Sequence, residues 1–200
     1  MNISFKATNE LNTTINKCTS QNVDNCTKIP ASFIRLNPES TADYYAINNV
    51  ADNYTRIITE ENLLNDGKKV KNYAKDIQSD FEEIYKNSHQ AQNDYFYALT
   101  TQTDRFEHID YSKVIGVAEV WNCPEISDFL DIRYLQVSPS TNHDVANREY
   151  RNIGTTILNA LKSLFPLRNI YVIADKNVRD FYTKNGFKVF RGNQMIYKVK

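Results

Sequence analysis

Apolar residues recur along the chain with two different periods, which predict where helices and strands lie. Over 40–60 and 70–85 they return every three or four residues, the period of an amphipathic helix. Ser40 stands where the first of these helices would be capped, and Asn65-Asp66-Gly67 should separate the two. The apolar stripes are Tyr44, Ile47, Val50, Tyr54 and Ile57, and Val70, Tyr73, Ala74, Ile77, Phe81, Ile84 and Tyr85.

Short runs rich in β-branched and aromatic residues predict the strands. These runs lie at 31–37, 95–101, 113–121, 129–137 and 169–175, with a terminal hairpin around Arg191-Gly192-Asn193. Two more helices are expected, one over 153–164 and one over 177–186, where Gly186 is a natural left-handed stop. The order of elements predicts one α/β domain with a single central sheet. We expect this domain to span 29–200, after a polar, weakly structured arm over 1–28.

Charge and composition narrow the class of function. The chain has 24 basic and 24 acidic residues, whereas nucleic-acid binders usually have a basic excess, so no nucleic-acid partner is expected. No run approaches the roughly 20 apolar residues that span a bilayer, and the N-terminus lacks a signal-peptide core. We therefore expect a cytoplasmic protein with no membrane partner. Free thiols are favoured over a Cys18–Cys26 pair, and the scattered His and Cys residues predict no metal site.

One helix start has no ordinary capping box: the stretch REYRNIGTTILNAL over 148–161. The first N–H groups of a helix lack internal partners, and the helix dipole adds partial positive charge there, so an anion can bind. Gly154 would permit close approach, Arg151 would add charge, and Thr155 and Thr156 would add hydroxyl donors. The alternative is a plain junction between loop and helix, because most helix starts bind only water.

The C-terminal half, about 113–190, resembles the Gcn5-related N-acetyltransferase (GNAT) family. The resemblance rests on LDIRYLQVSP, the glycine-bearing helix start and FYTKNGFKVF. The family pattern at the helix start is Arg/Gln-x-x-Gly-x-Gly/Ala; this chain keeps Gly154 but has Glu149 and Asn152 at the first and fourth positions. Asn tolerates positive φ, so the turn can still form. The resemblance implies an α/β fold with a single mixed, mostly antiparallel central sheet, splayed into a V, flanked by helices and holding acetyl-CoA.

The resemblance also implies roles for individual residues. The backbone of the strand end would bind the pantetheine arm, and the helix start would bind the diphosphate. These residues are Leu135, Gln136 and Val137, and Arg151, Asn152, Ile153, Gly154, Thr155 and Thr156. Tyr182 would protonate the leaving thiolate; the alternative, less favoured by its place in FYTKNGF, is a core aromatic. Asn177 would either cap the last helix or contact the cofactor.

A base must also take the proton from the acceptor amine. Asp131 matches the strand position of the catalytic glutamate in the histone-modifying branch of the family, and its alternative role is a salt bridge with Arg133. Glu119 is the second candidate, because burial among apolar residues would raise its pKa; otherwise it is a solvated edge residue.

The sequence thus predicts an acetyl-CoA-dependent N-acetyltransferase acting by direct transfer to a primary amine, on a small molecule or a protein. The alternative is a catalytically silent domain that binds acyl-CoA or a partner. A homodimer is left open.

Overall fold

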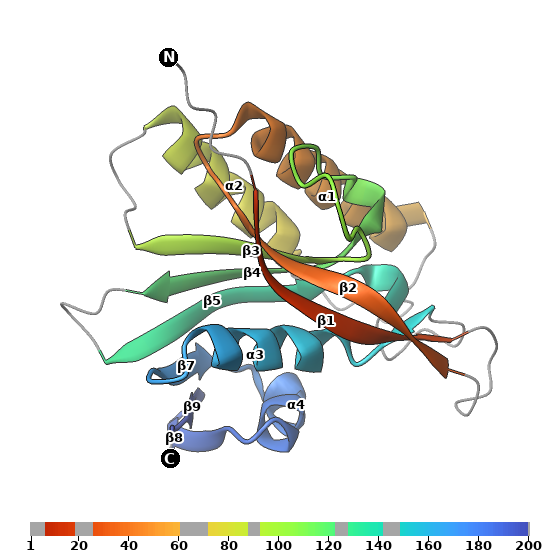
Figure 1. The fold of residues 1–200 in the computed structure, drawn as a ribbon. Coiled ribbons are helices and arrows are strands. Elements are labelled where there is room, and N and C mark those ends of the chain that lie inside the picture. The colour runs from red at the N-terminus through yellow and green to blue at the C-terminus, as the bar shows by residue number, and fades with distance from the viewer. Residues whose placement is uncertain are drawn as a thin grey trace.

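The computed structural model describes residues 7–18, 26–60, 72–87, 93–122, 128–141 and 149–199. Within these residues the strands join into one sheet with the order β6-β1-β2-β3-β4-β5-β7-β9-β8 (Figure 1). The strands are β1 (Thr8–Cys18), β2 (Cys26–Leu36), β3 (Asp94–Thr100), β4 (Val114–Asn122), β5 (Phe129–Val137), β6 (Tyr150–Arg151), β7 (Asn169–Ile173), β8 (Lys188–Arg191) and β9 (Gln194–Tyr197). The helices are α1 (Thr41–Glu60), α2 (Tyr73–Lys86), α3 (Ile153–Leu164) and α4 (Arg179–Lys184), with short 3-10 turns η1 (Tyr111–Lys113), η2 (Pro139–Thr141) and η3 (Lys176–Val178).

Helices cover both faces of this sheet. Helices α1 and α2 lie on one face, and α3 and α4 lie on the other (Figure 1). Each face has its own core: Ile47, Tyr54 and Phe81 are buried on the first, and Ile157 and Leu158 on the second. The stripes predicted from the sequence are therefore the faces that α1, α2 and α3 bury against the sheet.

The sheet splits between β5 and β7, its one parallel pair of neighbours among the described strands. Their pairing ends at Ile132 and Val172, but β5 continues to Val137 and there pairs only with β4. One edge of β5 is thus left without a strand partner from Arg133 onward. The register with β4 also shifts at this point, because Glu119 faces Tyr134 while Val120 faces Ile132. This bulge gives Arg133 no register partner on β4. The mixed, mostly antiparallel sheet splayed into a V is confirmed.

The N-terminal segment departs from the prediction. Residues 8–18 form β1, which pairs in antiparallel register with β2, and β2 begins at Cys26 rather than at residue 31. The expected weakly structured arm over 1–28 is therefore wrong for 8–18 and 26–28. Few apolar residues mark β1, with Ile15 fully within the core, so backbone pairing rather than an apolar pattern defines the strand.

The two N-terminal cysteines form a disulfide. Cys18 and Cys26 are register partners at the end of the β1–β2 pair, and a bond joins their sulfurs. The prediction of free thiols is wrong because directly opposed residues of antiparallel strands are close enough to bond. That opposition became visible only with the register of the strands.

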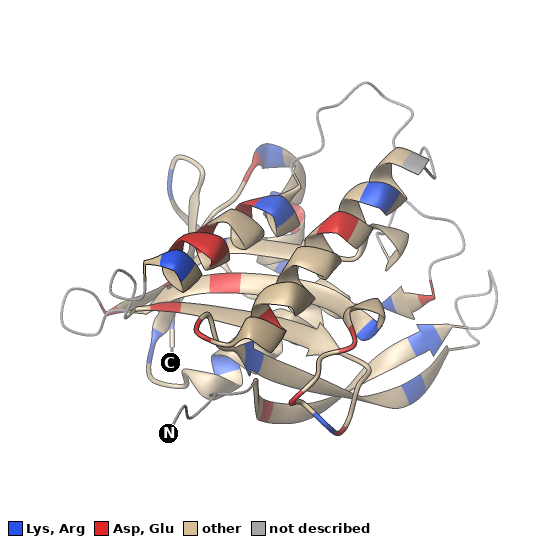
Figure 2. Ribbon diagram, turned by 90° about the horizontal axis from the view of Figure 1, so that it is seen from above, with Lys and Arg blue, Asp and Glu red and all other residues tan. Residues whose placement is uncertain are grey.

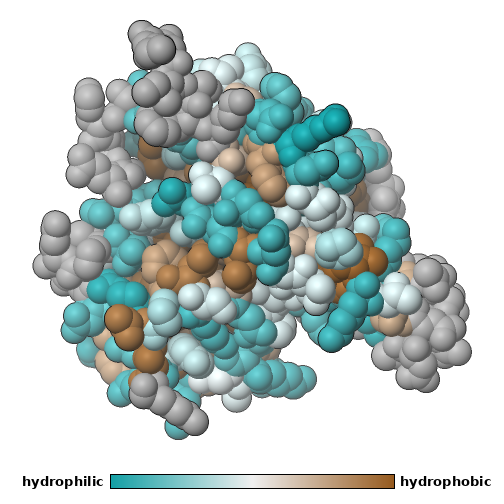
Figure 3. All heavy atoms as spheres, viewed as in Figure 1, coloured by the Kyte–Doolittle hydropathy of each residue, from teal (hydrophilic) through white to brown (hydrophobic). Residues whose placement is uncertain are grey.

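The surface features of the described residues say little more about the function. Apolar side chains reach the surface over β8, where Val189 and Phe190 are exposed (Figure 3). In the described residues, no helix combines the length and apolar character needed to cross a membrane. Nor do three or more metal-ligating side chains come together in these residues.

Candidate active site

The start of α3 is an uncapped helix end with a strained residue in front of it. Asn152 is the N-cap with φ 61° and ψ 23°, the left-handed conformation, and makes no side-chain cap bond. The first intrahelical bond runs from the Thr156 N–H to the Asn152 carbonyl. The N–H groups of Ile153, Gly154 and Thr155 therefore precede the first bond of a 12-residue helix. The sequence expectation that Asn152 can make this turn is confirmed.

Gly154 is needed for packing as well as for the backbone. A Cβ at this position would lie 2.9 Å from Cζ of Phe181 and 3.8 Å from Cγ1 of Val137. The absence of a side chain thus lets α3 lie against α4 and the end of β5. From the sequence, Gly154 was expected to permit the approach of a ligand; its close packing against Phe181 is a second reason for a glycine here. Ile153 is buried in the core, so only its backbone can meet a ligand.

The side chains around this helix start are partly committed to the protein. Thr156 donates its hydroxyl hydrogen to the Asn152 carbonyl at 3.1 Å, while Thr155 is half-buried. Arg151 is half-buried and its Nε finds no hydrogen-bond partner within the described residues. Glu149, which replaces the basic or amide residue of the family pattern, forms an ion pair with Lys17 at 3.0 Å. Its negative charge is therefore balanced beside the helix start.

The free edge of β5 runs from the split toward this helix start. Leu135 and Val137 pack against the α3-side core, whereas Gln136 points to the opposite face of the sheet. The Gln136 Oε1 accepts from the Ala74 N–H at 2.6 Å, which fixes the first turn of α2 on β5. Alternate backbone groups of this segment bond β4, and the others face the split, where no strand follows.

Tyr182 lies on α4 with its ring in the core. It contacts Phe181 and Phe187, with ring centroids 5.0 Å and 5.3 Å away. Burial, and secondarily the nearby Tyr73, raise the pKa of the Tyr182 hydroxyl, so the phenol keeps its proton at neutral pH. Tyr182 is therefore a core aromatic on the α3 side of the sheet, and its role as the proton donor stays a prediction.

Asn177 does not cap α4, and its contact with the cofactor stays a prediction. It is exposed in η3, and α4 begins after Val178 with no side-chain cap. The expectation that Asn177 caps the helix is wrong, because the 3-10 turn separates it from the helix start.

Glu119 is fully buried on the central strand β4, with 0% exposure. Its Oε1 is 3.4 Å from Nη1 of Arg133, and its Oε2 has no hydrogen-bond partner in the described residues. Burial, and then the charges of Asp80 and Asp94, raise the pKa of Glu119 to about 8 against the opposing effect of Arg133. The reading of Glu119 as a solvated edge residue is wrong, because β4 lies between β3 and β5 beneath α2.

Asp131 is half-buried and lies opposite Trp121 on β4 and Tyr171 on β7. Burial raises the pKa of Asp131, and the charge of Arg133 acts against that. The expected Asp131–Arg133 salt bridge does not form, since the guanidinium reaches Asp94 at 2.9 Å and Glu119 at 3.4 Å instead. The bulge at Arg133 explains the difference, because it breaks the alternation of side chains along β5.

Four further residues of this site were not singled out from the sequence. The Tyr73 and Tyr134 rings lie 5.5 Å apart across α2 and β5, and the charge of Asp80 acts on the Glu119 carboxyl. Asp94 binds Arg133. The acidic residues of α2 are visible in the sequence, but their spacing alone does not place them over β4 and β5. Figure 2 shows acidic residues both on α2 and on the strands beneath it.

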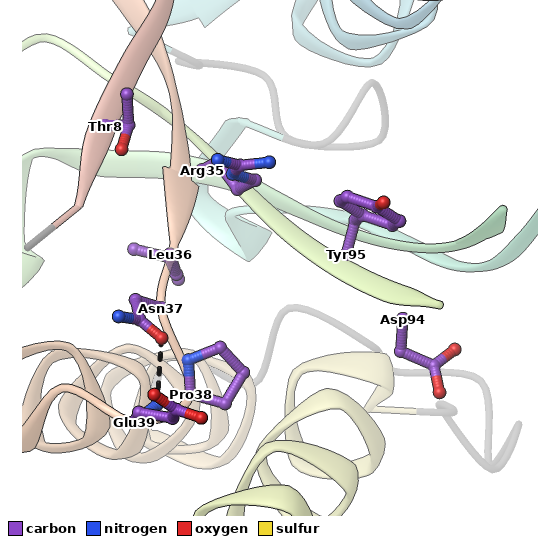
Figure 4. Close-up of a pocket in the computed structure, with 8 residues that line it drawn as sticks. All are labelled: Thr8, Arg35, Leu36, Asn37, Pro38, Glu39, Asp94 and Tyr95. Carbon is purple, nitrogen blue, oxygen red and sulfur yellow. Dashed lines mark hydrogen bonds between the residues drawn. The ribbon is translucent and has the colours of Figure 1, made fainter. Parts of the chain in front are cut away.

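A cavity of about 340 Å³ lies at the N-terminal end of β3 (Figure 4). It is lined by Thr8, Arg35, Leu36, Asn37, Pro38, Glu39, Asp94 and Tyr95. Arg35 is held by Glu10 at 3.2 Å and lies 5.9 Å from the centroid of the Tyr95 ring. This cavity shares only Asp94 with the residues of the split described above.

Comparisons with known proteins identify the fold. No protein-family model and no curated protein sequence matches the chain. Among solved structures, a candidate N-acetyltransferase from Lactobacillus plantarum matches with TM-score 0.51 and 10% identity, over 85% of this chain and 99% of that one. A candidate GNAT-family acetyltransferase from Desulfovibrio desulfuricans matches with TM-score 0.50 and 15% identity, over 83% and 94%.

The PaiA N-acetyltransferase from Thermoplasma acidophilum, a complex with coenzyme A, has 18% identity and TM-score 0.48 over 83% and 96% of the two chains. The likenesses to the Lactobacillus and Desulfovibrio structures show that this chain has the GNAT acyl-CoA N-acyltransferase fold. The fold expected from the sequence is thereby confirmed.

Proposed function

We propose that the protein is an acetyl-CoA-dependent N-acetyltransferase that transfers the acetyl group directly to a primary amine. One observation carries this proposal: the edge of β5 without a strand partner runs from Arg133 to Val137, and Val137 lies beside Gly154 at the uncapped start of α3. An extended thioester that carries phosphate groups fits this arrangement, because backbone N–H groups at the helix end and along the strand edge are available to bind it. The GNAT fold supports the same assignment.

The donor half of the site would be built mainly from backbone. The N–H groups of Ile153, Gly154 and Thr155 would bind the diphosphate, with Arg151 adding positive charge. The segment Leu135–Val137 would bind the pantetheine arm as an added strand. An N–H on the same edge would polarise the thioester carbonyl as negative charge develops on its oxygen.

The reaction needs one proton removed and one proton supplied. The neutral amine attacks the thioester carbonyl, the C–N bond forms and the C–S bond breaks. Tyr182 donates its proton to the departing thiolate, and a carboxylate accepts the proton from the amine nitrogen. Glu119 fits the second role best, because a carboxyl with a pKa of about 8 is both partly ionised and basic near neutral pH. Asp131 remains the second candidate for this role.

The proposal is tested by binding first and turnover second. We expect acetyl-CoA and CoA to release heat in calorimetry and to raise the melting temperature. With acetyl-CoA and an amine panel, thiol release should follow. Tyr182→Phe should lower kcat by at least about tenfold and leave the Kd for acetyl-CoA within about twofold. Tyr111→Phe, at an exposed tyrosine, is the matched control and should behave as wild type.

Two outcomes separate the alternatives. Absence of any heat and any thermal shift at millimolar acetyl-CoA would refute the proposal. Tight binding without thiol release on any amine would instead support a catalytically silent acyl-CoA-binding domain.

A further inference from the structure

We infer that the Cys18–Cys26 disulfide controls donor binding: it holds β6 in place and so fixes the start of α3, and its reduction weakens the binding of acetyl-CoA. This inference rests on the proposed function and adds a redox-dependent positioning element to the same donor site. It concerns three segments that meet beside the helix start, namely the end of β1, the beginning of β2 and the whole of β6.

Strand β6 is the last element before the helix start. It has only two residues, Tyr150 and Arg151, and the left-handed Asn152 follows directly. Among the described strands, β6 pairs with β1 alone. Strand β1 also lies against α3 (Figure 1). The position of the turn at Asn152 therefore depends on the position of the end of β1.

Cys18 connects β6 to the disulfide. Its backbone N–H donates to the Glu149 carbonyl at 2.8 Å, on the side of β1 that faces β6. In an antiparallel ladder the N–H and C=O groups of one residue point to the same side, so the backbone of Cys18 does not bond Cys26. The disulfide thus joins the last residue of β1 to β2 at a pair where the backbone ladder does not.

The other contacts of β6 are few. By the same alternation, Asn16 and Arg151 form the next hydrogen-bonded pair of the β1–β6 ladder. Lys17 and Glu149 form an ion pair across these strands at 3.0 Å, but their side chains are 42% and 52% exposed, so the pair adds little. Lys17 also lies 5.9 Å from the centroid of the Tyr150 ring. Strand β6 is therefore held mainly by backbone bonds to a strand end that the disulfide anchors.

Reduction of the disulfide releases this anchor. A dithiol reductant transfers two electrons and two protons: the S–S bond breaks, the thiols of Cys18 and Cys26 form, and the reductant closes its own disulfide. Cys26 is half-buried, which lets a small reductant reach the bond. The end of β1 is then joined to β2 by backbone pairing alone, beginning with Lys17 and Thr27.

The consequence for binding is a loss of preorganisation at the helix start. The body of α3 stays in place, because Ile157 and Leu158 are fully buried in the core. The turn in front of it presents the N–H groups of Ile153 to Thr155, and without the anchor the ligand must order this turn as it binds. Ordering a segment on binding costs affinity, so the reduced protein should hold the diphosphate more weakly.

The test compares two donors, acetyl-CoA and S-acetylpantetheine, because the second thioester lacks the diphosphate. The protein is assayed oxidised and after reduction with dithiothreitol, which is removed under argon, at a temperature where melting curves show both forms fully folded. We expect reduction to raise the Kd for acetyl-CoA at least about fivefold, the low end of the usual coupling between two sites. The value of kcat/KM for S-acetylpantetheine with the same amine should change by less than about twofold.

Cysteine variants assign the effect to this bond. Cys18→Ser/Cys26→Ser should bind acetyl-CoA as weakly as the reduced wild type and should not respond to reductant. Cys123→Ser replaces the third cysteine of the chain, which lies outside the described residues, and should keep the full response.

Two proline variants test the path through β6. Asn16→Pro removes an N–H that faces Arg151, whereas Thr14→Pro removes an N–H on the same side of β1, where no described strand lies opposite. Thr14 stands opposite Pro30 of β2, and the missing N–H of Pro30 fits this alternation. In the oxidised protein, Asn16→Pro should weaken acetyl-CoA binding and Thr14→Pro should bind as wild type.

The outcomes separate this inference from the proposed function. Equal Kd for acetyl-CoA in the oxidised and reduced proteins would overturn the inference and leave the proposed function standing. Equal losses with both thioesters would also overturn it, because reduction would then act on the whole fold, and so would equal binding by the two proline variants. Absence of acetyl-CoA binding to the oxidised protein overturns the proposed function, and the inference with it.

Discussion

The two sides of the split between β5 and β7 differ in what they offer a ligand. On the α3 side the chain presents backbone N–H groups at an uncapped helix end, with Lys17 and Glu149 balancing each other nearby. On the α2 side it presents side chains, chiefly carboxylates and tyrosines around Glu119. The first side offers backbone donors to an anion, and the second offers titratable side chains.

This difference predicts that the two sides respond differently to substitutions. A backbone site persists when side chains vary, provided that the turn at Asn152 and the packing at Gly154 are kept. The α2 side depends instead on the identity of its side chains, Glu119 above all.

The largest expected effect is a loss of catalysis on replacing Glu119, which lies on the α2 side of the split. Glu119→Gln should lower kcat by about 10² to 10⁴-fold, the usual contribution of a general base, without changing the Kd for acetyl-CoA. In wild type, kcat/KM should rise with pH as a group with a pKa near 8 loses its proton. A variant with wild-type kcat and an unchanged pH profile would transfer the role to Asp131.

The same carboxyl predicts a pH dependence of stability. Its pKa is raised from 4.5 to about 8 in the folded protein, so the folded state favours the protonated form. The stability that this protonation provides is fully present below pH 4.5 and is lost as pH rises to about 8. Melting temperatures of Glu119→Gln and wild type should therefore diverge across this window, with the variant relatively more stable at the alkaline end. Parallel curves from pH 4 to 9 would contradict the assignment.

The next effect tests the packing behind the α3 side. Gly154→Ala places a methyl group 2.9 Å from the Phe181 ring and should cost about 1–3 kcal/mol of unfolding free energy. Adding Phe181→Leu should restore part of this loss, because the clash is with the ring. Denaturant unfolding of the two single variants and the double variant measures the coupling. Strictly additive losses would show that the contact does not limit the helix position.

Removing the disulfide, which lies at the edge of the α3 side, is expected to lower the free energy of unfolding by a similar or smaller amount. Cys18 and Cys26 enclose a loop with a sequence separation of 8, for which chain entropy predicts roughly 2.5 kcal/mol. The Cys18→Ser/Cys26→Ser variant should lose about that much stability. A reducing agent should lower the melting temperature of wild type to the same value and leave the variant unchanged. Identical melting of wild type with and without reductant would contradict the bond.

The smallest effect concerns the turn in front of α3. Asn152→Gly should change the unfolding free energy by less than about 1 kcal/mol, since glycine readily adopts the left-handed conformation. Asn152→Val should cost more, about 1–2 kcal/mol, because a β-branched residue is strained there. Thermal unfolding of both variants checks the order, and equal stability of the two would contradict the assigned conformation.

The sequence predicted the C-terminal half well and the N-terminal edge poorly. The strands β4, β5 and β7 and the helices α2 and α3 have strong periodic patterns, so their positions followed from periodicity. Strand β1 is rich in Asn and Thr, and its partner β2 could not be known before the register was. The disulfide was missed for the same reason.

The candidate site divides in the same way. The uncapped start of α3 and the role of Asn152 were readable because they depend on local backbone chemistry. The pairing of Arg133 with Asp94, and the effect of Asp80 on Glu119, join residues from α2, β3, β4 and β5. Such contacts depend on the order of strands and on the bulge in β5, neither of which a single sequence displays.

The central claim is that the split of the sheet binds an acyl-CoA donor along β5. A crystal structure with CoA tests it most directly. The account predicts phosphate oxygens within hydrogen-bond distance of the N–H groups of Ile153 to Thr155, and the pantetheine arm beside Leu135–Val137. A nucleotide bound elsewhere, for example in the cavity lined by Arg35 and Tyr95, with nothing beside β5, would contradict it.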